Sequence, residues 1–140
     1  MIIAECGDEV AEWLEEKLLI SLADTNAQAE NSNIILAARE SEDQIIGGLV
    51  SSTSYGWLLV KILWVEMNCR GSGVGRSLME HAELSAMTRG CHGAWLDTSS
   101  AAAHKVYMSL GYETFGELHN HDEQHPSGHQ RWFMKKLLRL

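Results

Sequence analysis

A glycine-rich turn is the feature that most constrains how this chain can fold. It joins an apolar run, Trp57–Val65, to a segment from Gly73 to Arg89 whose apolar residues recur at helical spacing. The turn carries alternate glycines at Gly71, Gly73 and Gly75. Glycine leaves backbone N–H groups open to a ligand, and the start of a helix adds unbonded N–H groups and a positive dipole end. The pattern therefore predicts a strand, an anion-binding turn and a helix in succession.

The spacing of the glycines narrows the choice of anion. A dinucleotide fingerprint needs G-x-G-x-x-G, but Arg76 occupies the third glycine position, and the lysine of a P-loop is absent. The spacing present is R-x-x-G-x-G, formed by Arg70, Gly73 and Gly75. Both arginines would add charge-assisted hydrogen bonds to a phosphate. A pyrophosphate cradle is one interpretation, and a purely structural strand-to-helix turn is the other.

The rest of the pattern predicts a mixed α/β domain. We expect helices over residues 8–22 and 101–110, a hairpin over 33–39 and 44–53, and strands over 93–98, 112–118 and 130–138. Residues 25–32 are typical of a loop or a short irregular helix. On the central helix, Glu80 and Glu83 are expected to lie away from the apolar stripe formed by Val74, Leu78, Met79, Ala82 and Ala86. No linker divides the chain, so we expect residues 1–140 to form a single domain.

Composition excludes several classes of function. A net charge of −8 argues against a nucleic-acid partner, whose phosphates call for clustered Lys and Arg. The apolar run at 57–65 is too short to cross a bilayer and the N-terminus lacks the basic start of a secretory signal, so we expect no membrane partner and a cytoplasmic location. The scattered cysteines and the His-rich loop at 119–129 match no standard zinc spacing, so no metal is expected.

Two segments in order resemble the GNAT superfamily of N-acetyltransferases. Residues 63–76 are similar to its acetyl-CoA pyrophosphate loop, and residues 102–112 are similar to its helix ending in Tyr-x-x-x-Gly-Phe/Tyr. The likeness extends from about Ile34 to the C-terminus. It implies a central, mixed and mostly antiparallel twisted sheet of about six or seven strands flanked by helices. It also implies acetyl-CoA as cosubstrate and, by family analogy, a homodimer.

The resemblance assigns cofactor-binding positions residue by residue. On the strand they are Leu63, Trp64 and Val65, along which the pantetheine arm would lie as an extra strand. In the turn and the helix start they are Arg70, Gly71, Ser72, Gly73, Val74, Gly75 and Arg76. Downstream they are Ser100, which is also expected to cap a helix, and Tyr107.

The same resemblance implies a mechanism in which a neutral amine attacks the thioester directly. Tyr107 matches the general acid that protonates the departing CoA thiolate, although a buried tyrosine is also a common core residue. A backbone N–H near Val65 would stabilise the oxyanion. Glu66 is the nearest carboxylate to act as base, since residues 57–63 contain no acid. A solvated charge is an equal interpretation of Glu66, and a water chain or a histidine of the 119–129 loop would serve instead.

Three functions remain open at the level of sequence. The leading hypothesis is acetylation of a primary amine on a small molecule. The alternatives are a protein lysine or N-terminal acetyltransferase and a catalytically silent acetyl-CoA-binding module. The presence of Tyr107 favours an enzyme, whereas the missing strand acid and the unusual run Ala101–Ala103 keep the silent module open.

Overall fold

The structure is a computed structural model that describes residues 1–25 and 31–139. Its helices are α1 (Asp8–Thr25), α2 (Val74–Thr88) and α3 (Ala101–Ser109), with a 3₁₀ turn at Met67–Cys69. Its strands are β1 (Asn33–Ser41), β2 (Gln44–Ser54), β3 (Trp57–Val65), β4 (Gly93–Thr98), β5 (Glu113–His119) and β6 (Gln130–Leu137). Every expected element is confirmed. Of the expected loop at 25–32, Thr25 ends α1, and residues 26–30 lie outside the described part.

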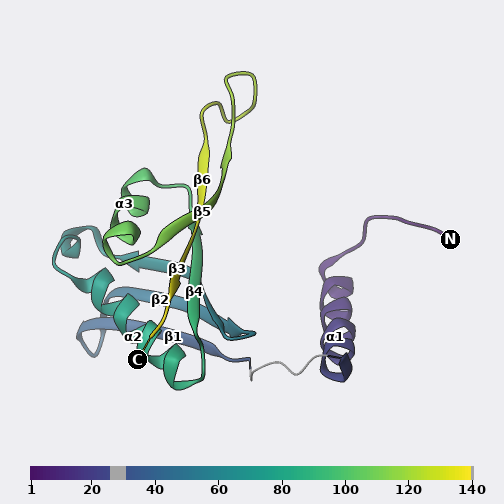
Figure 1. Cartoon of the computed structure of the whole chain (residues 1–140), viewed down its shortest axis with the longest axis horizontal. Coiled ribbons are helices and arrows are strands. Elements are labelled where there is room, and N and C mark those ends of the chain that lie inside the picture. Colours follow the sequence, from purple (N-terminus) through teal and green to yellow (C-terminus); the bar gives the residue numbers. More distant parts are fainter. Residues whose placement is uncertain (26–30, 140) are drawn as a thin grey trace.

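The strands form one six-stranded sheet in the order β1-β2-β3-β4-β6-β5 (Figure 1). Neighbouring strands are antiparallel except β3 and β4, which are parallel. The expectation of a mixed, mostly antiparallel sheet is therefore confirmed. In the described part of the chain, no helix has the length and hydropathy to cross a membrane.

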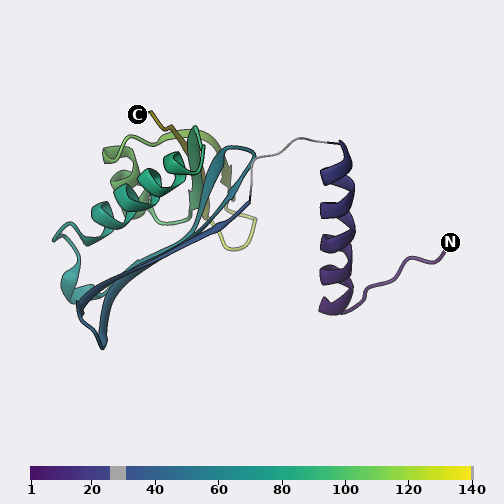
Figure 2. The same ribbon diagram turned by 90° about the horizontal axis from the view of Figure 1, so that it is seen from below.

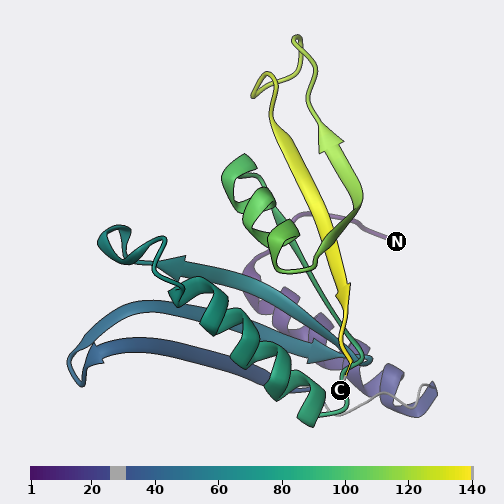
Figure 3. The same ribbon diagram turned by 60° about the vertical axis from the view of Figure 1, so that its left-hand side comes forward.

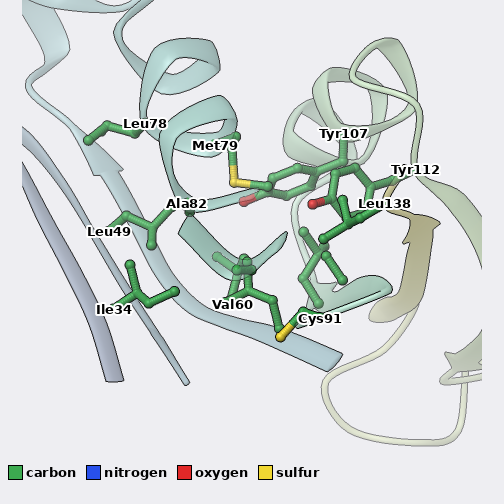
Figure 4. Packing of buried hydrophobic residues seen from close by; sticks show 14 of the residues in the cluster. Ile34, Leu49, Val60, Leu78, Met79, Ala82, Cys91, Tyr107, Tyr112 and Leu138 are labelled. Carbon is green, nitrogen blue, oxygen red and sulfur yellow. The ribbon is translucent and has the colours of Figure 1, made fainter. Parts of the chain in front are cut away.

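Helices α2 and α3 cover the same face of the sheet (Figure 3). The core lies beneath them and includes Leu49, Leu58, Leu96 and Met134 of the strands and Met79 of α2, each at most 1% exposed. Figure 4 shows Leu49 and Met79 within this cluster. The apolar stripe expected on α2 is confirmed, because Leu78, Met79, Ala82 and Ala86 are all buried. This core fixes the positions of β3, α2 and α3, which surround the candidate site.

Glu83 corrects one expectation, because its side chain is buried and not directed to solvent. It is 6% exposed and accepts hydrogen bonds from the Tyr112 hydroxyl at 3.0 Å and the Lys136 ammonium at 2.7 Å. Glu83 follows Met79 by four positions, so it lies on the helix face that packs on the sheet. The paired charge and the hydroxyl offset the cost of burying its carboxylate.

The opposite face of the sheet has no helix packed against it in the described residues. On β3, Leu58 and Val60 are buried under α2 and α3. The pairing with β2 skips Lys61, and this β-bulge reverses the alternation, so Ile62 and Trp64 lie on the other face and are exposed. The strand is apolar on both faces as expected, yet only one face is covered. Helix α1 stands on this open side and apart from the rest of the chain (Figures 1 and 2).

Candidate active site

The sheet opens between its two parallel strands. β3 and β4 pair only from Trp57↔Gly93 to Leu59↔Trp95, and beyond that point they diverge (Figure 3). A cavity of about 520 Å³ occupies this opening. Its lining comes from β3 (Leu63, Val65), from the glycine turn with the start of α2 (Cys69, Arg70, Gly71, Gly73, Gly75, Arg76) and from α3 (Ala103, Val106, Tyr107). Three segments distant in sequence thus meet around one space.

The glycine turn adopts a conformation that other residues rarely reach. Gly71 and Gly73 have φ values of 80° and 93°, in the left-handed region. A Cβ atom at either position would meet nothing within 4 Å, so backbone conformation, and not lack of space, requires glycine there. Gly73 caps α2, and the first turn of that helix carries no acidic side chain. The unbonded N–H groups and the helix dipole therefore favour an anion at this end of the cavity.

The two arginines of the turn line the cavity and are exposed to solvent. Arg70 is anchored, because its Nε donates a hydrogen bond to the carbonyl oxygen of Val65 at 2.9 Å. Ser72 tightens the same turn by donating from its hydroxyl to the carbonyl oxygen of Cys69. The turn therefore carries positive charge without an acidic partner in the cavity lining.

The backbone of Val65 presents a free edge to the cavity. The N–H of Glu66 donates to the carbonyl oxygen of Ile46 on β2 at 2.7 Å. Successive N–H groups along a strand point to opposite edges. The N–H of Val65 is therefore directed away from β2, to the edge that β4 no longer pairs with.

Tyr107 enters the cavity from α3 and is only 9% exposed. Burial raises the pKa of its hydroxyl above the ordinary phenol value. Among the described residues this hydroxyl has no hydrogen-bond partner, although no fully buried polar side-chain atom is left unpaired. The hydroxyl is thus neutral and available as a donor. Figure 4 shows its ring beside Tyr112, with ring centroids 6.0 Å apart.

Five residues expected at the site do not line this cavity. Trp64 is 45% exposed on the open face of the sheet, because neighbouring strand residues point to opposite faces. Ser72 and Val74 line a smaller hollow of about 350 Å³ between β1 and α2. Ser100 caps α3, as expected, by accepting from the N–H of Ala103 at 3.2 Å. Glu66 is half-buried just past β3, outside the cavity lining.

Three residues that line the cavity, Cys69, Ala103 and Val106, were not predicted from the sequence. Ala103 and Val106 precede Tyr107 by four and one positions, so helical spacing alone would have placed Ala103 on the same face of α3. Cys69 directly precedes the glycine turn. Apolar or small residues of this kind carry no chemical signal of their own, which is why only the fold reveals them.

Comparison with known proteins agrees with this geometry. The family model of the acetyltransferase (GNAT) domain matches residues 30–114, more than half of the chain. Acetyltransferase Atu2258 of Agrobacterium fabrum is 34% identical over 91 residues, which are 65% of this chain and 66% of that protein. Blasticidin-S acetyltransferase of Streptomyces morookaense is 37% identical over 70 residues, 49% of this chain and 52% of that protein. The chain thus spans just under two thirds and about half of the lengths of these two relatives.

Similarity in three dimensions is more extensive. The crystal structure of an acetyltransferase from Agrobacterium tumefaciens superposes with a TM-score of 0.84 and 26% identity, over 98% of each chain. The order of the helices and strands places the glycine turn, at the start of α2, beside the opening between β3 and β4. The chain belongs to the GNAT family of acetyltransferases, enzymes that use acetyl-CoA as their acetyl donor.

Proposed function

We propose that residues 1–140 form a single acetyltransferase domain that acts in the cytoplasm and transfers the acetyl group of acetyl-CoA to a primary amine of a small molecule. The observation that carries the proposal is the cavity between β3 and β4. It joins an anion-binding turn, an unpaired strand edge and the hydroxyl of Tyr107. These groups match the three parts of the cofactor, namely the pyrophosphate, the amide-bearing pantetheine arm and the thioester.

The cofactor would lie along the cavity in an extended form. The pyrophosphate would bind the N–H groups of Gly71 to Gly75, with Arg70 and Arg76 neutralising its charge. The pantetheine amides would pair with the free edge of β3 at Leu63 and Val65, in the manner of an added strand. Ser72, Val74 and Ser100 are included in this proposal by family analogy alone, since they do not line the cavity. Trp64 would contribute only through its place in the strand, because its side chain lies on the open face. This assignment extends the family's cofactor positions to the matching residues of the chain.

The transfer would proceed by direct attack. The amine nitrogen bonds to the thioester carbon, the N–H of Val65 stabilises the resulting oxyanion, and the C–S bond then breaks. Tyr107 donates its proton to the departing CoA thiolate. The raised pKa of Tyr107 keeps this hydroxyl protonated at neutral pH.

The incoming amine must be neutral, so a group must accept its proton. Glu66 is the first candidate, acting through water from its half-buried position past β3. His129 is the second, since its Nε2 lies 3.3 Å from the Ser99 hydroxyl just beyond β4. The loss of the acid limb from the pH–rate profile of Glu66→Gln, or instead of His129→Gln, would identify the base.

A small-molecule acceptor is favoured by the relative whose name states an acceptor, blasticidin S. The net charge of −8 also suits a cationic amine. No feature of the described residues specifically favours a protein substrate. Screening amines by release of the CoA thiol tests this choice directly.

Calorimetric titration of acetyl-CoA into wild type and Gly73→Asp tests the cofactor site. The added carboxylate would repel the pyrophosphate, so we expect binding to fall at least 100-fold. Gly128→Asp is the matched control, because Gly128 also has positive φ (70°), open space around its Cβ, and a position in the distant 119–129 loop. No binding by folded wild type, or equal losses in both variants, would refute the assignment. Acetyl-CoA binding without release of thiol on any amine would instead indicate a silent binding module.

A further inference from the structure

The uncovered face of the sheet carries a broad apolar surface, which we call the open face. Alternation along β1 and β6 places Ile35 and Leu137 on it, at 70% and 58% exposure. On β3, the bulge at Lys61 brings Ile62 and Trp64 to the same face, at 55% and 45% exposure. A groove of about 750 Å³ crosses its centre, lined chiefly by Trp57, Leu59, Trp95, Phe115, Phe133 and Lys135. Exposed apolar surfaces of this extent mark interaction sites.

Helix α1 is a second apolar surface without a partner. Trp13, Leu14 and Leu18 recur at helical spacing on one side and are 55%, 54% and 58% exposed. No side chain between Asp8 and Leu22 is buried. The helix projects away from the sheet to which its own chain connects it (Figure 2). A helix this apolar, standing in water, would not be stabilised by its own sequence alone.

The two surfaces complement each other in size and charge. The helix is about 27 Å long, and a six-stranded sheet is about 24 Å wide across its strands. The other side of α1 carries Glu9, Glu12, Glu15 and Glu16. The groove has a cation at its edge, because the ammonium of Lys135 lies 5.7 Å from the centre of the Phe115 ring. A helix with one apolar side and one acidic side would therefore suit an apolar groove that is bordered by Lys135.

We propose that α1 of one copy of this chain docks on the open face of a second copy, and that the exchange is reciprocal. Such an interface is isologous, so a single twofold axis buries both helices and both faces. Stable homodimer interfaces bury about 2,000 Å² or more in total, and this arrangement covers two helices and two sheet faces at once. The alignment with the A. tumefaciens crystal structure covers 98% of the chain, which includes α1. The proposal does not depend on the identity of the amine.

Sedimentation equilibrium on the full chain provides the first test. Wild type should be a dimer, whereas Trp13→Glu combined with Leu18→Glu should be a monomer. The matched control is Glu12→Gln with Glu16→Gln, on the other side of α1, which should remain dimeric. Acetyl-CoA binding by all three proteins would verify that the domain is folded. A monomeric wild type, or a Trp13/Leu18 variant that still dimerises, would overturn the proposal.

Cysteine cross-linking provides the second test and distinguishes exchange from closure onto the same chain. Cys6 and Cys69 are first replaced by Ser, and Leu14→Cys and Phe115→Cys are introduced at two exposed positions. When separate chains carry one cysteine each, mixing them should give a cross-linked heterodimer. When one chain carries both, the bond should still join two chains. A cross-link within a single chain, or no cross-link in either format, would refute the exchange.

Discussion

Tyr107 and Tyr112 form a matched pair in which the loss of one hydroxyl should affect catalysis and the loss of the other stability. Both side chains are buried, at 9% and 3% exposure, and their rings are in contact. The hydroxyl of Tyr112 donates to the buried carboxylate of Glu83. The hydroxyl of Tyr107 faces the cavity and has no hydrogen-bond partner in the described residues. Replacing either tyrosine by Phe removes only its hydroxyl group, so the two variants make the same chemical change at neighbouring positions.

The two expected effects are of different kinds. Tyr107→Phe should lower kcat by about 100- to 1,000-fold, the usual contribution of a general acid, with little change in the free energy of unfolding. Tyr112→Phe removes a hydrogen bond to a charged acceptor, worth about 1.5–3 kcal/mol. For a chain of 140 residues this corresponds to a fall in Tm of about 5–10 °C. Its kcat should stay within about threefold of wild type, because the hydroxyl lies outside the cavity lining.

Steady-state release of CoA thiol, calorimetric affinity for acetyl-CoA and scanning calorimetry together resolve these effects. For Tyr107→Phe, kcat should fall while the affinity for acetyl-CoA is retained. If Tyr107→Phe instead lowers Tm and leaves kcat unchanged, then Tyr107 is a core residue and the general acid lies elsewhere. A loss of cofactor affinity in step with activity would likewise contradict the acid role.

Two further predictions concern the turn and the buried phenols. Gly73→Ala should lower Tm by about 3–7 °C, because alanine resists a φ of 93° at a cost of about 1–2 kcal/mol. Gly75→Ala should instead raise Tm slightly, because alanine favours the helix and its new methyl would lie at an ordinary 3.7 Å from Val65. Scanning calorimetry measures both changes in Tm. If the two variants shift Tm in the same direction, the argument is refuted. Burial raises the pKa values of Tyr107 and Tyr112, and Glu83 raises that of Tyr112 further. The unfolded chain therefore ionises first, so stability should be full below about pH 10 and decline above it. Denaturant titrations should show a shallower decline for Tyr112→Phe, and an equally steep one would count against the shift.

Much of the fold could be predicted because glycines and apolar runs coincide with the ends of its elements. The bounds of β3 and β4 match the expected strands, and the helices α2 and α3 stop before Gly90 and Gly111, which have φ values of 90° and 97°. These signals are local, so a single sequence contains them. The burial of Glu83 is different, since it depends on Tyr112 and Lys136, which are 29 and 53 residues away.

Part of the candidate site could also be predicted from the sequence. The glycine turn, Leu63, Val65 and Tyr107 do meet around one cavity, because a strand, a turn and a helix in fixed order bring them together. Trp64 does not, since the β-bulge at Lys61 reverses the alternation along β3 and directs Trp64 to the open face. The divergence of β3 from β4 could not be foreseen, because it depends on how two parallel strands meet the rest of the sheet and not on their residues alone.

The glycine turn has a consequence for turnover. The groups it offers, backbone N–H and guanidinium, are suited to the phosphate end of the cofactor, which the reaction leaves unchanged. Contacts to that end stabilise bound acetyl-CoA, the transition state and bound CoA by the same amount. They therefore lower KM without raising kcat. Free CoA should therefore compete with acetyl-CoA at nearly equal strength. Under the proposed function, the rate would therefore depend on the ratio of acetyl-CoA to free CoA.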